Sequence, residues 1–158
     1  MTPWAHIPQL AFSGITMGAV YALVGLGFVT IARASQIINF AQGEFVMLGG
    51  MITFFLLKGV GLPYPLAALL AVLLVVIIGF LVHIMVVYPL RKASVPILLI
   101  ATLGVSIFIS NTTALVFGTL PKALPAFWGN QPLQIRGIFV TPQSLFVLGA
   151  TFLLLISL

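Results

Sequence analysis

The sequence predicts an all-α protein, a polytopic bundle of about four complete transmembrane helices and a fifth that the end of the sequence truncates. Of its 158 residues, 62% are hydrophobic and 4% are charged, whereas a soluble domain carries about 25% charged residues. Its apolar runs are long and do not alternate in polarity as barrel strands do. Because lipid offers a backbone N–H or C=O no partner outside its own segment, these runs are expected to be helices.

The first two predicted spans are residues 10–31 and residues 37–57. The first contains no charged residue over 22 positions and is followed by Arg33. A helix of this length is long enough to cross a hydrocarbon core of about 30 Å. The second is interrupted by four polar or flexible residues, namely Asn39, Gln42, Gly43 and Glu44. The sequence therefore predicts that the second helix is broken.

Two further complete spans follow a turn rich in glycine and proline at residues 58–65. The third is expected at residues 66–88, with Pro89 marking its exit from lipid. The fourth is expected at residues 96–117 and is more polar than the others.

The end of the chain is expected to hold a long loop and part of a span. Residues 118–141 contain several prolines and Trp128, which is typical of an extramembrane loop with an interfacial aromatic residue. Pro142 suits a helix N-terminus, and residues 145–158 are apolar for 14 positions. Since a span needs about 20 residues, we expect that the fifth helix is cut and that the sequence is a fragment.

Several classes of protein are excluded by composition. The six basic residues, which with one acid give a net charge of +5, are scattered and form no patch for nucleic acid. No cysteine is present, and His6 and His83 lie far apart, so no metal site is expected. The chain has no nucleophile with a neighbouring base, no paired carboxylates and no phosphate-binding glycine loop. It is therefore not expected to be an enzyme or to bind a cofactor itself.

Glu44 is the one acidic residue of the sequence, and a carboxylate at mid-bilayer costs at least a few kcal/mol. In one interpretation, a discontinuous helix lets Asn39, Gln42, Gly43 and Glu44 line a translocation path near the membrane midplane. In the other, Glu44 lies in the first turn of a helix at the membrane interface, where the helix dipole stabilises it. The sequence leaves both open.

Small residues recur every fourth position in the first span, at Gly14, Gly18 and Ala22. Such a face lets helices approach closely. We interpret it as packing within the molecule rather than as a dimer contact.

Two other polar features have a functional and a structural interpretation. His83 could belong to a proton relay, but an interfacial, hydrogen-bonded histidine is the interpretation that we favour. The hydroxyl and amide side chains of the fourth span could line an aqueous path, but bonds to neighbouring helices are favoured. They are Thr102, Ser106, Ser110, Asn111, Thr112 and Thr113.

Two stretches of sequence carry a resemblance to a known family. Residues 14–23, GITMGAVYAL, and residues 38–44, INFAQGE, resemble the opening of the permease subunits of branched-chain amino acid ABC importers. Residues 89–91, residues 103–107 and Asn111 are similar to the next landmarks of that family. The resemblance covers essentially the whole chain, and the INFAQGE element is its most specific part.

The resemblance implies that residues 1–158 are part of the transmembrane domain of an importer in a bacterial or archaeal cell membrane. Two homologous permease subunits would form the pore, two ATPase subunits would bind the ATP, and an extracytoplasmic binding protein would deliver the substrate. The numbers of Lys and Arg residues on the two sides of the membrane are equal and do not determine the orientation. The resemblance implies that the N-terminus lies outside. Related permeases carry urea, amides or other amino acids, so the substrate is not determined.

Two alternatives stand beside this prediction. The chain could be an ion-coupled secondary transporter or channel that uses Glu44 and His83. It could also be a truncated membrane fragment whose helices pack but transport nothing.

Overall fold

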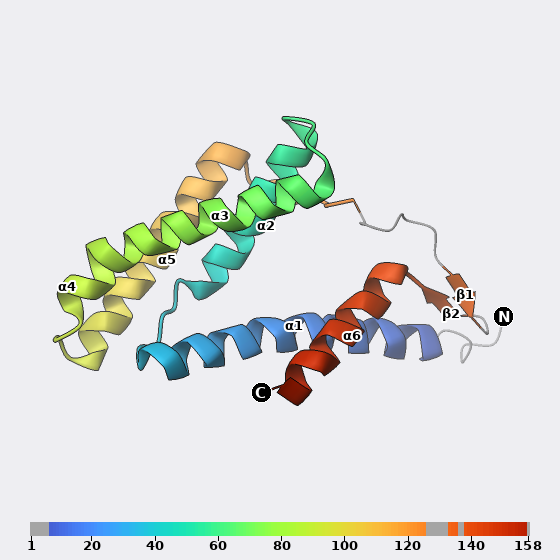
Figure 1. The fold of residues 1–158 in the computed structure, drawn as a ribbon, viewed down its shortest axis with the longest axis horizontal. Helices are drawn as coiled ribbons and strands as arrows, with labels where there is room; N and C mark the ends of the chain where they lie inside the picture. Colours follow the sequence, from blue (N-terminus) through green and yellow to red (C-terminus); the bar gives the residue numbers. More distant parts are fainter. Residues whose placement is uncertain (1–6, 126–132, 136–137, 158) are drawn as a thin grey trace. The chain divides into compact units, whose positions relative to one another are not determined.

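The structure, a computed structural model, describes residues 7–125, 133–135 and 138–157 (Figure 1). Its elements are α1 (Ile7–Ser35), α2 (Gln42–Lys58), α3 (Tyr64–Val82), the π-helical turn η2 (His83–Val87), α4 (Tyr88–Leu90), α5 (Val95–Phe117), β1 (Leu133–Ile135), β2 (Ile138–Val140) and α6 (Pro142–Ser157). The chain divides into two units, residues 1–29 with 125–158 and residues 30–124. We call them unit 1 and unit 2 and describe each by itself.

The predicted helical spans are confirmed, with one of them shorter than expected. Among the described residues, three helices are long and apolar enough to cross a membrane, namely Ile7–Ser35, Tyr64–Leu90 and Val95–Phe117. α6 is a shorter apolar helix, Pro142–Ser157. The second predicted span forms a 17-residue helix, α2, because residues 37–41 at its start are not helical. A helix of this length falls a few residues short of the roughly 20 that span the hydrocarbon core.

The interruption of the second span is confirmed, but it lies before the helix and not inside it. Residues 36–41 join α1 to α2, and the helix then runs without a break from Gln42 to Lys58. Gln36 adopts a left-handed φ of 56°, and its side-chain amide donates to the carbonyl of Arg33 at 2.8 Å. A left-handed residue that follows a helix is a common way to stop it.

Prolines and a glycine set the ends of the other helices of unit 2. Pro65 and Pro96 lie in the first turns of α3 and α5, where the missing N–H costs no hydrogen bond. Gly118 ends α5 with a φ of 82°, a conformation that favours glycine.

The third span continues past its predicted end through a widened turn. In η2, the N–H of Tyr88 bonds the carbonyl of His83, five residues earlier. Pro89 was expected to end the helix, but α4 carries it to Leu90. Proline removes a donor and crowds the carbonyl four residues before it, and a local π-helical turn, such as the one directly before Pro89, is one way in which membrane helices accommodate a proline.

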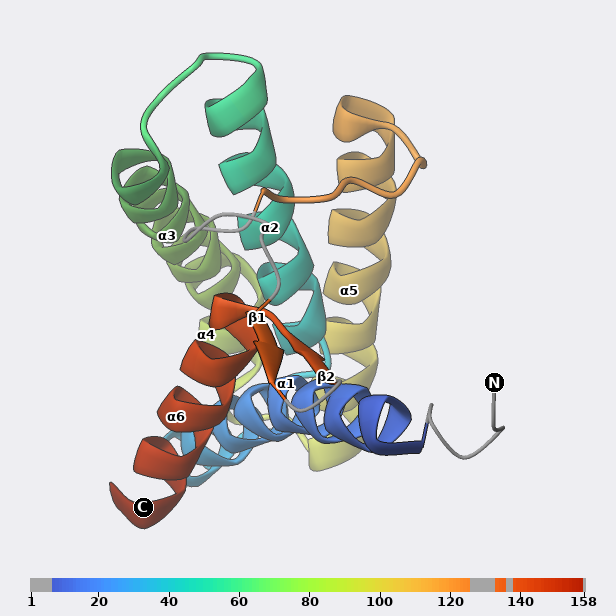
Figure 2. The same ribbon diagram turned by 90° about the vertical axis from the view of Figure 1, so that its right-hand side faces the viewer.

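The core of unit 2 forms where α2 packs against α3 and α5, which lie beside it in both ribbon views (Figures 1 and 2). It consists of small and aliphatic residues: Ala41, Leu48 and Ile52 of the α2 segment, Ala71 of α3, and Val105 and Ile109 of α5. Ala71 is 1% exposed, so α2 and α3 approach closely at this position. α2 is therefore the central helix of the unit.

Unit 1 contains most of α1, the hairpin β1–β2 and α6. Thr151 of α6 is buried, and its hydroxyl donates to the carbonyl of Ala19 at 3.4 Å and to that of Val147 at 2.7 Å. The side-chain amide of Gln9 donates to the carbonyl of Phe139 at 3.2 Å and accepts from its N–H at 2.7 Å. Gln9 thus contacts β2 as a paired strand would.

Residues 118–141, expected to be an extramembrane loop, contain a short hairpin that the sequence analysis did not predict. β1 and β2 pair antiparallel, with Leu133 opposite Val140. Trp128 and His6 lie outside the described residues.

Candidate functional site

The candidate site begins in the connection before α2, where Asn39 shapes the start of the helix. The side-chain oxygen of Asn39 accepts the N–H of Ala41 at 3.0 Å, and its carbonyl accepts the N–H of Gln42 at 3.3 Å. Such side-chain turns are typical of asparagine before a helix. Ala41 is fully buried and has no side-chain cap, so Asn39 organises this end of α2.

A threonine of α5 also bonds the connection before α2. The hydroxyl of Thr102 accepts the N–H of Phe40 at 3.3 Å and donates to the carbonyl of Leu99 at 3.1 Å. Thr102 is 1% exposed. Since an unpaired backbone N–H is costly in an apolar interior, this hydroxyl supplies the partner that the non-helical backbone of Phe40 needs.

Glu44 lies in the first turn of α2. It contacts Ser106, which lies one turn after Thr102 in α5. The hydroxyl of Ser106 donates to Oε1 of Glu44 at 3.0 Å, and the carboxyl group also lies where the helix dipole favours negative charge. The local placement of Glu44 is that of the second interpretation, in which it begins a helix. Its role in a translocation path stays a prediction.

The polar residues of the fourth span therefore behave differently from one another. Thr102 and Ser106 bond the segment of α2, as the favoured interpretation expected. Asn111 instead donates to the carbonyl of Ile107 in its own helix at 2.7 Å. Their four-residue spacing places Thr102 and Ser106 on one face of the helix, but a spacing within one helix does not indicate its partner 62 residues earlier.

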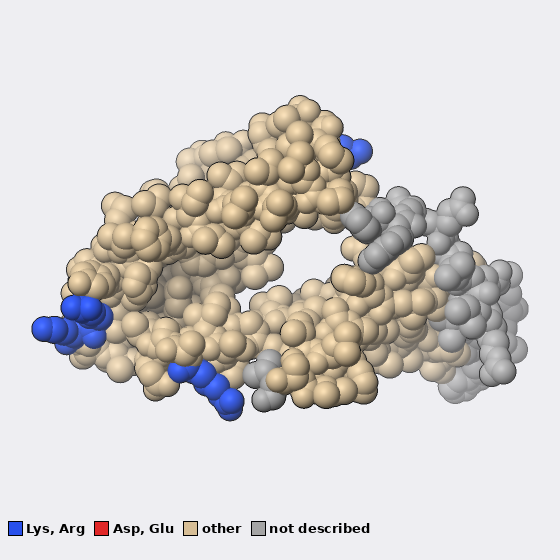
Figure 3. Space-filling view, in the orientation of Figure 1, with Lys and Arg blue, Asp and Glu red and all other residues tan. Residues whose placement is uncertain are grey.

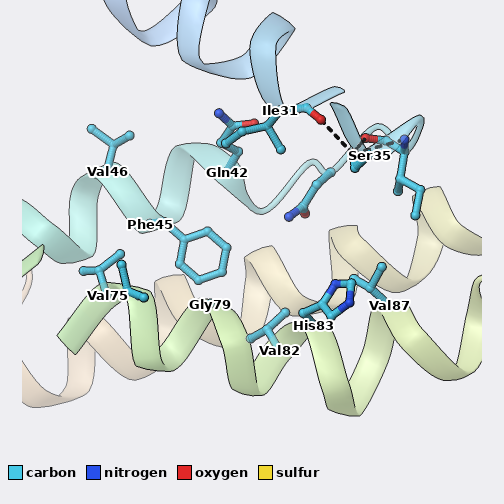
Figure 4. A pocket seen from close by; sticks show the side chains of 13 residues that line it. Ile31, Ser35, Gln42, Phe45, Val46, Val75, Gly79, Val82, His83 and Val87 are labelled. Carbon is cyan, nitrogen blue, oxygen red and sulfur yellow. Dashed lines mark hydrogen bonds between the residues drawn. The ribbon is translucent and has the colours of Figure 1, made fainter. Parts of the chain in front are cut away.

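A cavity of about 460 Å³ lies between the start of α2 and the helix α3–η2. We call it the α2–α3 cavity. Figure 4 shows the ring of Phe45 and the imidazole of His83 projecting into the space between these helices, with Gln42 on the α2 side. Its lining includes four polar side chains, Ser35, Asn39, Gln42 and His83, and an apolar wall that includes Phe45, Val75 and Val82.

The structure thus brings together residues that the sequence analysis treated separately. Asn39 and Gln42 share the cavity with His83, which lies more than 40 positions later in the sequence. Glu44 is turned toward Ser106 on α5. Gly43 is exposed, with no atom of the described residues within 4 Å of an added Cβ, so it neither breaks the helix nor makes a close contact there.

The small residues of α1 lie in unit 1, apart from this site. No atom among the described residues lies within 4 Å of an added Cβ at Gly14 or Gly18, and Ala22 is half-buried. Instead, α6 contacts α1 at Ala19. The packing role of Gly14, Gly18 and Ala22 stays a prediction.

The other charged residues of unit 2 lie near the ends of helices or in the connections between and after them. On the face shown in Figure 3, basic side chains gather where α4 and α5 meet, and no acidic side chain is visible. Arg91, in this turn, lies over the ring of Tyr88 at 4.2 Å from its centroid. No group of three His, Cys, Asp or Glu side chains that could hold a metal ion occurs in the part of the chain that the structure describes.

Comparison with known proteins places the chain among transport permeases. Residues 10–158 match the sequence profile described as branched-chain amino acid transport system, permease component. The high-affinity branched-chain amino acid transport system permease protein LivH of Salmonella typhimurium is 30% identical over 131 residues, which cover 78% of this chain and 42% of that protein. The permease protein BraD of Pseudomonas aeruginosa is 31% identical over 165 residues, covering 97% and 54%.

The chain thus spans about half the length of these curated relatives. No solved structure matches it.

Proposed function

Because the chain belongs to the family of branched-chain amino acid transport permeases, we propose that it is a transmembrane subunit of an ATP-driven importer of branched-chain or related amino acids. The observation that carries the proposal is the family match over residues 10–158. The long apolar helices agree with it, because a permease must provide the membrane-spanning part of the transporter.

The source of energy is assigned to other polypeptides. The sequence contains no Gly-x-x-x-x-Gly-Lys-[Ser/Thr] loop for phosphate binding. We therefore propose two ATPase subunits as partners, with ATP bound to them and no cofactor on this chain. A second homologous permease subunit would complete the pore, and an extracytoplasmic binding protein would deliver the amino acid. The assembly would lie in the cell membrane of a bacterium or archaeon.

The path of the substrate is proposed to pass the start of α2. Three features support this: the non-helical backbone at residues 36–41, the acidic Glu44 held by Ser106, and the cavity that Asn39 and Gln42 line. Irregular backbone at membrane depth is tolerated where it is buried in protein or lines a water-filled space. Asn39, Gln42, Gly43 and Glu44 are the proposed pathway residues.

Reconstitution tests the proposal. The assembled transporter that contains this chain is placed in liposomes, and uptake of radiolabelled leucine, isoleucine and valine is measured with ATP supplied to the ATPase side. Uptake should fall to background when the ATP, the ATPases or the binding protein is omitted. Uptake that persists without ATP and collapses with an ionophore would instead identify an ion-coupled transporter. A chain that assembles but imports none of these amino acids would contradict the assignment of branched-chain amino acids as substrates.

A further inference from the structure

The α2–α3 cavity has the size and the lining of a binding site for a small amphipathic molecule. Its volume of about 460 Å³ lies within the range of about 300–1,000 Å³ that small-molecule sites occupy. Phe45, Val75 and Val82 form an apolar wall, and the side chains of Asn39, Gln42 and His83 supply amide and imidazole groups. Such sites typically combine an apolar lining with a few polar groups that orient the ligand.

Three of the four polar side chains of this cavity are available to a ligand, whereas the Ser35 hydroxyl donates to the carbonyl of Ile31. Among the described residues, neither Gln42 nor His83 makes a side-chain hydrogen bond, and Asn39 uses only its side-chain oxygen, toward Ala41. The amide nitrogens of Asn39 and Gln42 and the imidazole of His83 therefore remain to bond something that enters the cavity. Between them they present both donors and acceptors.

The position of His83 along its helix makes this placement informative. His83 lies seven residues before the end of the span at Leu90, which is about 10 Å along a helix axis. An ionisable side chain at such a depth is expected to face a protein interior or an aqueous cavity and not lipid. The π-helical turn begins at His83, and single π-helical turns occur frequently at functional sites.

Neighbouring cavities provide a contrast. A cavity between α3–η2 and α5 is lined by apolar residues alone, among them Leu81, Met85 and Phe108. A third cavity, which lies further along α2 than the α2–α3 cavity, has Thr53 as its single hydroxyl-bearing residue. This hydroxyl donates to the carbonyl of Gly49. Apolar cavities of this kind suit acyl chains. The α2–α3 cavity differs because polar groups from two segments converge in it.

We infer that the α2–α3 cavity binds the transported amino acid during its passage, and that His83 is a substrate-contacting residue. The inference rests on the proposed function. The aliphatic side chain would lie against Phe45, Val75 and Val82, and the amino and carboxylate groups would bond Asn39, Gln42 and His83. A small molecule with one compact polar end and a branched apolar body matches this lining at both ends.

Protection of single cysteines tests the occupancy of the cavity, since the chain has no cysteine of its own. Gly79→Cys and Val46→Cys each place a thiol in the lining, and Gly79 has room for a side chain. Leu81→Cys is the matched control, because Leu81 lies on the same helix but lines the apolar cavity. The labelling rate with a small methanethiosulfonate reagent is measured in the assembled transporter, with and without saturating leucine.

Leucine is expected to slow the labelling of both cavity cysteines several-fold and to leave Leu81→Cys unchanged. Equal rates with and without leucine in either cavity variant that still imports leucine would overturn the inference while the proposed function stands. A parallel slowing of all three would also overturn it, because it would indicate a general conformational change. Failure of the parent transporter to import any branched-chain amino acid would instead contradict the proposed function.

Transport kinetics provide an independent readout for His83. His83→Ala should raise the KM for leucine several-fold with little change in maximal rate, and His83→Gln, which keeps a hydrogen-bonding group, should recover most of the loss. Met85→Ala is the control, since Met85 belongs to the same π-helical turn but lines the apolar cavity. An unchanged KM in His83→Ala would contradict a contact with the substrate.

Discussion

Glu44 shows how one residue can be recognised in a sequence while its partner is not. Glu44 is the one acidic residue of the sequence and lies in an apolar stretch. It could be predicted as a candidate site residue because a carboxylate in a membrane needs a partner or water. The structure supplies the partner as Ser106, at 3.0 Å. The pairing joins positions 62 residues apart and depends on how α2 packs against α5, which a single sequence does not report.

Replacement of the carboxylate is the test at this scale. Glu44→Gln keeps the size of the side chain and an oxygen that can accept from Ser106, but removes the negative charge. If the charge acts in the path, uptake in the assembled transporter should fall about tenfold or more while the amount of assembled complex stays near the parent level. The control is Ser106→Ala, which leaves the charge and removes the hydroxyl. Uptake by Glu44→Gln equal to that of the parent would remove the carboxylate from the mechanism.

At the scale of elements, the sequence predicted where helices lie more accurately than where they begin. The fourth span was expected at residues 96–117 and α5 is Val95–Phe117, because Pro96 and Gly118 bound a run without charged residues. The second span was expected from residue 37, but Asn39 binds the N–H of Ala41 and delays the helix to Gln42.

Other local features left no pattern to read. β1 and β2 have three residues each, too few for an alternation of polar and apolar residues to be recognised. The convergence of Asn39 and Gln42 with His83 depends on the packing of two helices. The sequence therefore predicted the candidate residues of α2 but not the cavity that some of them line.

The contact between α5 and the connection before α2 is tested by Thr102→Val. Valine keeps the shape of threonine but cannot accept the N–H of Phe40, which would then lie unpaired beside a fully buried Ala41. The expected cost is about 1–3 kcal/mol, seen as a lower midpoint of thermal unfolding in detergent. Thr112→Val, at an exposed position of the same helix, should change the midpoint little. Equal midpoints for the two variants would show that Thr102 does not support this connection.

At the scale of the whole molecule, the alternation of helices predicts which connections face the same side of the membrane. If α1, α2 and the helix from α3 to α4 each cross the bilayer, the connection after α1 and the α4–α5 turn lie on one side, and the α2–α3 connection lies on the other. Arg33, Arg91 and Lys92 would then share a side. The family resemblance implies that this side is the cytoplasm.

Single cysteines report this topology. Lys92→Cys and Val60→Cys both replace exposed residues in connections, and no native cysteine competes for label. In intact cells, a membrane-impermeant maleimide should label Val60→Cys and reach Lys92→Cys only after the membrane is opened. Labelling of both cysteines in intact cells would show that the helix from α3 to α4, which lies between them, does not cross. The reverse pattern would place the N-terminus inside.

The contact of Gln9 with β2 affects whether another protein can pair with the hairpin. Its amide occupies both the N–H and the carbonyl of Phe139, the backbone groups that β2 turns away from β1. An open strand edge is a template on which a foreign polypeptide can extend the sheet. Because the side chain of Gln9 already bonds these backbone groups of Phe139, a neighbouring protein would have to displace Gln9 before it could add a strand there.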